Sequence, residues 1–253
     1  MPDSEFRNAK LWSRIQNLDF VNVPACWTSC DGGRCCSNNF PDFNFRLLPT
    51  EGTTILYLEQ EYDFLKAEGK TFESKRDASP AQLLDLDYGG PRPLRIVQAH
   101  CGLMGRCAGV IAKPLLCKLY PFLPVMNADG EIEDLAPASI FDLTAEEFGV
   151  LLPCGVRESA KSILERWRKD GAVREVFQHP YILFHLMAAS AFIENYRWSI
   201  RSNGHLSRFR GAEFWTNWEL QYLGGRLLDV DSLKKSIADI YRVVVERHGL
   251  FLE

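Results

Sequence analysis

The chain has 253 residues, of which 46% are hydrophobic and 25% are charged, and its formal net charge is −4. This composition is typical of a globular protein with one large or two small domains. The negative charge argues against a general affinity for nucleic acid. The first 18 residues include acids and no apolar core, so no signal peptide is expected, and no apolar run reaches the roughly 20 residues of a membrane span. We therefore expect a cytoplasmic protein that does not bind a membrane.

The cysteines are the most informative residues of the sequence. Four fall within eleven residues and four more follow, which gives Cys26, Cys30, Cys35, Cys36, Cys101, Cys107, Cys117 and Cys154. In a reducing compartment, clustered cysteines more often bind metal or perform redox chemistry than form disulfides. A chain of this length also does not need disulfides to fold. We interpret the eight as metal or iron–sulfur ligands; disulfides and unrelated buried thiols are the alternatives.

In the first third of the chain, the pattern indicates an amphipathic N-terminal segment, the first cysteine cluster and then a helix. Residues 1–22 form an amphipathic segment, and Pro24 breaks the chain before the cluster. Asp31-Gly32-Gly33 predicts a turn, whose glycines let several thiolates converge on one point. Residues 45–48 suggest a short strand. A helix that starts near Pro49–Glu51 and ends at Gly69 is then expected from the helical spacing of Ile55, Leu58, Tyr62 and Leu65.

Residues 69–93 are polar and rich in glycine and proline, so a surface loop is expected there. Residues 94–97 predict a strand that leads into the second cysteine block. A hairpin should follow, with its turn at Asn127-Ala128-Asp129-Gly130 and its second strand at residues 131–135. The remainder predicts helices: one that begins with a capping box at Thr144–Glu147, one directly after Cys154, one over 181–200, one around Trp215, and a last one that begins at Asp231 or Ser232 and ends at Gly249.

The cysteine spacing is Cys-x3-Cys-x4-Cys-Cys, then 64 residues, then Cys-x5-Cys-x9-Cys, and finally Cys154. It matches neither the Cys-x2-Cys knuckles of a zinc ribbon nor the common ferredoxin runs. Adjacent side chains in an extended segment point to opposite faces, so Cys35 and Cys36 could serve two sites or two irons of one cluster. His100, next to Cys101, is a candidate extra ligand; a histidine hydrogen-bonded within a strand is the alternative. His179 and His185 are interpreted as structural.

The cysteines and the residues around them resemble those of a known family. The chain resembles the YkgJ-like cysteine-cluster proteins, a family of zinc- or iron-chelating domains, over roughly residues 20–155. The resemblance rests on the first cluster with Leu47-Leu48-Pro49-Thr50-Glu51 after it, and on the second block, which runs Cys101-Gly102, Gly105-Arg106-Cys107, Lys113-Pro114, Cys117 and Tyr120-Pro121-Phe122. Lys113 stands where the family usually has arginine, and Thr50 where glycine is common. Flagellin lysine N-methylases carry a similar cluster, and that kinship implies a [4Fe–4S] centre with S-adenosylmethionine as methyl donor.

A basic stretch lies in the C-terminal region. Arg197, Arg201, Arg208 and Arg210 stand, with His205, in a stretch without acidic residues from Asn195 to Ala212. Such a stretch could receive an anionic substrate or the acidic surface of a partner. A solvated helix end followed by a loop is the alternative that we favour.

Together these observations predict an α-rich α+β fold. An irregular Cys-rich metal-binding half with a short hairpin (residues 20–155) would pack as one unit with a C-terminal helical bundle (156–253). The eight cysteines would bind one or two [4Fe–4S] clusters, with Zn²⁺ as the alternative. The predicted function is group (methyl) transfer or redox chemistry. The predicted partner is a protein or peptide substrate, or a redox partner. A structural zinc protein, or a metal-handling or electron-transfer protein without catalytic activity, is the alternative.

Overall fold

The computed structural model describes residues 2–21, 53–71, 80–101, 103, 112–149 and 155–252. Within these ranges the chain is a mixed α+β protein rich in helix. The elements of the first part are α1 (Pro2–Asn17), β1 (Thr53–Leu58), α3 (Glu59–Ala67), β2 (Gln82–Leu86), β3 (Leu94–Cys101), α4 (Leu115–Leu119), β4 (Phe122–Met126), β5 (Ile132–Pro137) and α5 (Ile140–Glu147). The second part holds η3 (Gly155–Ser159), α6 (Ala160–Lys169), α7 (Gly171–Phe177), α8 (Pro180–Ser202), η4 (Leu206–Arg208), α9 (Gly211–Leu223) and α10 (Val230–His248).

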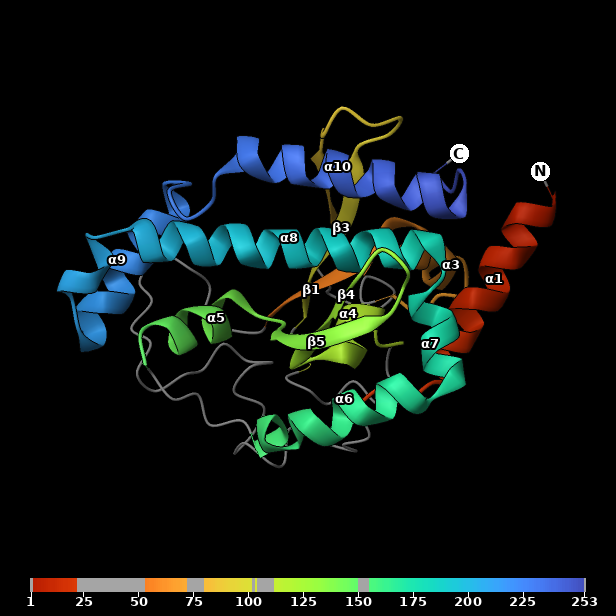
Figure 1. The fold of residues 1–253 in the computed structure, drawn as a ribbon, viewed down its shortest axis with the longest axis horizontal. Coiled ribbons are helices and arrows are strands. Elements are labelled where there is room, and N and C mark those ends of the chain that lie inside the picture. The colour runs from red at the N-terminus through yellow and green to blue at the C-terminus, as the bar shows by residue number, and fades with distance from the viewer. Residues whose placement is uncertain are drawn as a thin grey trace.

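The main hydrophobic core surrounds α8, the central helix in Figure 1. Helix α10 runs antiparallel along one side of α8, and the β4–β5 hairpin lies against another. Leu183, Phe184 and Trp218 are fully buried in this core. The same core contains Trp12 from the N-terminal helix, so a single hydrophobic cluster joins residues from both ends of the chain.

Strands β1, β2 and β3 form an antiparallel sheet in the order β1-β3-β2. Ile55 and Tyr57 of β1 stand opposite Ala99 and Val97 of β3, so these four side chains share one face. With Leu65 of α3 they form a second, smaller hydrophobic cluster. Helix α4 lies between the two clusters, because its Leu115 and Leu119 belong to the main core and its Cys117 borders the small one.

The predicted β4–β5 hairpin is confirmed. Its strands pair from Phe122 opposite Pro137 to Met126 opposite Ile132. The Asn127 side-chain oxygen accepts hydrogen bonds from the backbone N–H groups of Asp129 and Glu131, both at 3.0 Å. Gly130 has φ of +74°, a conformation that residues with a Cβ rarely adopt. The turn chemistry visible in the sequence therefore determines this hairpin.

The helix expected from Pro49 to Gly69 is wrong in its first half. Residues 53–58 form β1, and only Glu59–Ala67 is helical. Ile55, Leu58, Tyr62 and Leu65 fall at helical spacing by coincidence, because the series crosses the boundary between a strand and a helix. The β-branched and aromatic Thr-Thr-Ile-Leu-Tyr stretch favours a strand, and pairing with β3 decides it. Similarly, the loop expected over 69–93 contains the exposed strand β2.

Two helix starts also differ from the prediction. Helix α5 begins at Ile140, where Ser139 accepts a hydrogen bond from the Phe141 N–H, so Thr144 lies inside the helix. There the Thr144 hydroxyl donates to the Ile140 carbonyl and contacts the Tyr196 hydroxyl. Helix α10 is capped by Asp229, whose side chain accepts from the Ser232 N–H at 3.1 Å. In both cases several cap-forming residues stand close together, and packing selects one of them.

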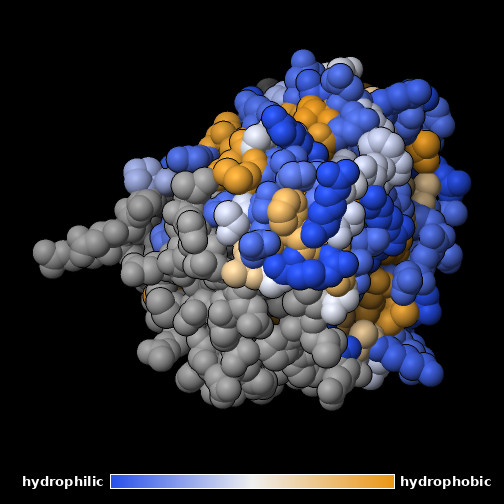
Figure 2. All heavy atoms as spheres, turned by 90° about the vertical axis from the view of Figure 1, so that its left-hand side faces the viewer, coloured by the Kyte–Doolittle hydropathy of each residue, from blue (hydrophilic) through white to orange (hydrophobic). Residues whose placement is uncertain are grey.

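Among the described residues, no single helix is long and apolar enough to cross a membrane, although α7 and α8, bent by 76° relative to each other, together satisfy length and composition. The end of the molecule around α9 shows a mainly hydrophilic surface with separate hydrophobic areas (Figure 2). The exposed apolar side chains of α9 are Leu220, Tyr222 and Leu223.

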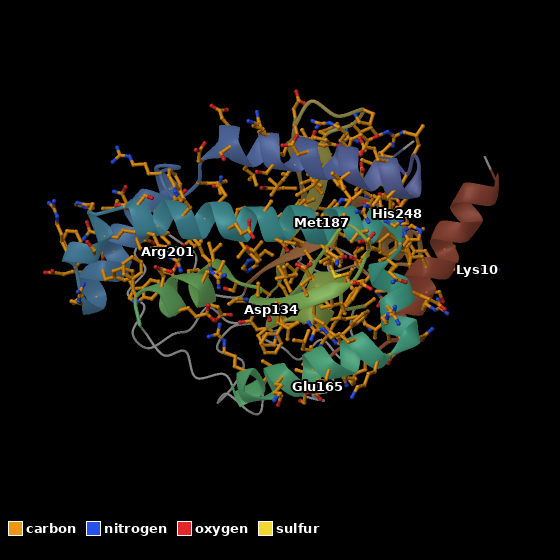
Figure 3. All side chains as sticks on the ribbon, viewed as in Figure 1. Lys10, Asp134, Glu165, Met187, Arg201 and His248 are labelled. Atoms are coloured by element: carbon orange, nitrogen blue, oxygen red, sulfur yellow. The ribbon has the colours of Figure 1, made fainter. Side chains whose placement is uncertain are left out.

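At the opposite end of α8, His248 of α10 lies close to the β4–β5 turn (Figure 3) and is 3.2 Å from the Ala128 carbonyl.

His185 provides a test of the core around α8. It is 7% exposed, its Nδ1 lies 2.7 Å from the Tyr181 carbonyl, and burial lowers its pKa to about 4. The unfolded chain therefore binds a proton near pH 6.5 that the folded protein does not bind until about pH 4. We expect stability to fall by about 1.4 kcal/mol per pH unit as the pH drops through this interval.

In His185→Gln the loss of stability that His185 causes at low pH should be absent, while a side-chain N–H donor remains. The measurement is urea unfolding of both proteins at pH values from 7 down to 4.5. The free energy of unfolding of the wild type should lose more over this range than that of the variant, and parallel pH profiles would contradict the assignment.

Candidate metal centre

The structure describes two of the eight predicted ligands, Cys101 and Cys117. The other six lie outside the described residues: Cys26, Cys30, Cys35, Cys36, Cys107 and Cys154. Within the described residues, no three His, Cys, Asp or Glu side chains are grouped so that they could hold a metal ion. A centre that includes Cys101 and Cys117 would therefore need ligands from the remaining cysteines.

Cys101 is the last residue of β3 and is 6% exposed. It stands opposite Thr53, the first residue of β1. His100 precedes it and is exposed, because successive side chains of a strand point to opposite faces. The structure thus places the His100 side chain on the face of β3 opposite to that of Cys101.

Cys117 is the central residue of the five-residue helix α4 and is half-buried. It packs against the small hydrophobic cluster that contains Cys101, although sixteen positions separate the two in the sequence. The structure therefore brings both described cysteines to the border of one apolar region. Such a region excludes water, which strengthens every electrostatic interaction made there.

Glu61 of α3 contacts α4 directly. It is fully buried, and its Oε1 accepts a hydrogen bond of 2.8 Å from the backbone N–H of Leu115. Burial raises the pKa of Glu61 to about 8, although the N–H groups of Leu115 and Leu58 and the charge of Lys118 act in the opposite direction. The carboxyl group is therefore mostly protonated, and so uncharged, at pH 7.

Lys118, next to Cys117, fixes α4 to the N-terminal helix. Its ammonium group donates to the carbonyls of Gln16 and Leu18, both at 2.8 Å, where the last carbonyls of α1 need donors. Burial lowers the pKa of Lys118, and the charges of Asp19 and Glu61 partly oppose that shift.

Just beyond these bonds, the Phe20 carbonyl accepts from Trp167 Nε1 at 2.6 Å and from Arg166. The chain that leads into the first cysteine cluster is therefore held on two sides, by α4 and by α6.

Asp142 of α5 joins α4 to the segment that follows Cys154. The Tyr120 hydroxyl, one residue beyond α4, donates to its Oδ2 at 3.2 Å, and Arg157 of η3 lies 3.3 Å from its Oδ1. Asp142 is 3% exposed, and burial raises its pKa while Arg157 and Tyr120 lower it. The region around α4 thus has polar contacts with residues that flank three of the cysteine-bearing segments.

Three arginines of the basic stretch, Arg197, Arg201 and Arg210, have partners within the chain. Arg197 pairs with Glu146 at 3.0 Å and Arg201 with Glu147 at 2.7 Å, so acids of α5 face this side of α8. Figure 3 shows Arg201 at the end of α8 near α9. Arg210 donates to the carbonyls of Ser207 and Phe209. The sequence showed no acids near these arginines because the partners are about fifty residues away.

Sequence reasoning missed Glu61 and Asp142. A signal was present for Glu61, because it stands four residues before Leu65 and so shares the buried face of α3. For Asp142 the sequence carries no comparable signal, since an acid in the first turn of a helix is ordinarily a favourable surface residue.

Comparison of the chain with protein-family models, with curated proteins and with solved structures finds no match.

The Asp142–Arg157 pair should be a strong stabilising contact. In Asp142→Ala the partly buried Arg157 guanidinium loses its nearest carboxylate, and breaking such a buried pair costs about 3 kcal/mol. The exposed pair Arg242–Asp239 supplies the control, because Asp239→Ala should cost less than about 1 kcal/mol. Urea unfolding of both variants measures the difference, and equal losses would show that Asp142 is no more important than a surface acid.

Proposed function

We propose that this chain is a metal-cluster protein whose cysteines bind one or two [4Fe–4S] clusters. The observation that carries the proposal is that Cys101 belongs to a small apolar cluster against which Cys117, distant in sequence and carried by the polar-anchored helix α4, also packs. The full ligand set is the eight cysteines of the chain: Cys26, Cys30, Cys35, Cys36, Cys101, Cys107, Cys117 and Cys154.

The surroundings of the two described cysteines suit thiolate ligation. A ligating thiol must lose its proton, so nearby negative charge weakens ligation and positive charge favours it. Lys118, the residue after Cys117, is the one basic residue of α4, and burial raises the pKa of Glu61, which is bonded to this helix, to about 8. Helix α4 therefore carries a cation, and the carboxyl group bonded to it ionises less readily than usual.

A [4Fe–4S] cluster supplies electron transfer, or an iron that can bind a substrate or cofactor. The resemblance to flagellin lysine N-methylases adds group transfer onto a protein or peptide, with S-adenosylmethionine as methyl donor, to this proposal. The competing function is a Zn²⁺ protein with a structural, metal-handling or electron-transfer role and no catalysis. The two differ in a directly measurable quantity, the metal and sulfide bound per chain.

The deciding measurement is iron, zinc and acid-labile sulfide on protein purified without oxygen, together with its visible spectrum. One cluster predicts about four irons and four sulfides per chain, and two clusters predict about eight of each. One or two zinc ions without sulfide would replace the proposal by the zinc alternative. Protein with neither metal would contradict both.

Single cysteine substitutions test the ligand assignment. Cys117→Ser and Cys36→Ser should each lower the metal content and the melting temperature, because ligation energy contributes to folding energy. Ala112→Ser is the matched control, since Ala112 packs against the same cluster as Cys117 and has no thiol. Metal content and melting temperature equal to those of the wild type in both cysteine variants would refute the assignment.

A further inference from the structure

Helix α4 has no cap of its own. The residue before it is Pro114, which makes no side-chain capping bond, and the helix is only five residues long. The first N–H groups of any helix lack partners within that helix and must find acceptors elsewhere. At α4 the Leu115 N–H finds its acceptor on another element, in Oε1 of Glu61.

Burying the Glu61 carboxyl group costs folding free energy, and packing within α3 alone does not require a carboxyl group at this position. Its side chain is fully buried, and its Oε2 has no hydrogen-bond partner among the described residues. A buried carboxyl group with an unsatisfied oxygen destabilises the fold relative to an apolar side chain of similar size. The bond that Glu61 does make is therefore the property that distinguishes it from leucine at this position.

The bond acts on the helix that carries the thiol. Leu115 lies two residues before Cys117, and Lys118, which is bonded to α1, lies one residue after it. Cys117 is thus flanked on α4 by two polar anchors, one from α3 and one to α1. Cys101, by contrast, lies on a strand whose position is determined by pairing with β1.

We propose that Glu61 is a positioning residue, whose hydrogen bond to Leu115 holds Cys117 against the small apolar cluster to which Cys101 belongs. The inference deepens the proposed function, on which it rests in taking Cys117 as a metal ligand. Groups that orient the ligands of a metal in this way commonly change metal affinity by about 10- to 100-fold when they are removed. Glu61 acts here through the backbone of the ligand's helix.

The test uses anaerobically purified protein in four variants. Glu61→Leu removes the acceptor, and Glu61→Asp withdraws it by one methylene while keeping a carboxyl group. Glu61→Gln keeps an acceptor on a side chain of the same length, and, like the protonated acid, it is uncharged. Asp63→Asn changes an exposed carboxyl group on the same helix and is the control.

Two readings are taken on each protein: bound metal during a titration with a chelator, and, once the metal has been removed, the rate at which iodoacetamide alkylates Cys117 and Cys101, located by peptide mass mapping. For Glu61→Leu and Glu61→Asp we expect metal affinity to fall about 10- to 100-fold. Alkylation of Cys117 should rise about tenfold relative to Cys101, because only α4 has lost its anchor. Glu61→Gln and Asp63→Asn should behave like the wild type.

Cys101 serves as an internal reference in every sample. Equal acceleration at both cysteines would show a general loss of stability and overturn the inference, as would unchanged rates and affinity in Glu61→Asp. If Glu61→Leu does not fold, Glu61→Asp decides the question. If the wild type binds no metal, the proposed function fails, while the ratio of the two alkylation rates still tests whether Glu61 positions Cys117.

Discussion

The hydrogen bond from the Leu115 N–H to Glu61 is the contact on which the arrangement around α4 depends. It joins α3 to α4 within a region closed to solvent, where neither group has water as a substitute partner. Burial raises the pKa of the carboxyl group to about 8, so the group that accepts this bond ionises less readily than an exposed acid.

Two kinds of interaction stabilise this fold, apolar packing and directional hydrogen bonds. The main core around α8 is large and aromatic, and shape complementarity among many side chains positions its helices. The small cluster beneath the sheet has few members, and apolar packing alone leaves a five-residue helix free to shift. Directional bonds from Glu61, Lys118 and the Tyr120–Asp142 pair supply the missing geometry.

This division matters for the proposed metal centre. Thiolates that share a centre must stand at fixed positions, and the six cysteines outside the described residues belong to segments whose flanks are held here. Phe20 is bonded to α6 shortly before the first cluster, Thr53 pairs with Cys101 after it, and Arg157 meets Asp142 shortly after Cys154. Described residues on the flanks of the first cluster and of Cys154 are thus bonded to elements distant in sequence.

Local patterns predicted much of the architecture. The amphipathic stripe of α1, the Asn127–Gly130 turn, the strand that precedes Cys101 and the apolar helix α8 all follow from interactions between residues near in sequence. Prediction failed where two elements meet: Ile55 and Leu65 satisfied a helical spacing across the β1–α3 boundary, and Thr144 offered a cap that Ser139 provides instead. In these places competing local signals are nearly equal, and tertiary packing chooses between them.

The sequence by itself determined the number and spacing of the cysteines, the turn types and the apolar faces, because these depend on residue type and on neighbours a few positions away. Only the tertiary structure decided that Glu61 meets Leu115, that Lys118 meets the end of α1, and that Arg197 and Arg201 meet the acids of α5. A polar group must find a partner when it is buried, but its own sequence neighbourhood does not say which distant group that partner will be.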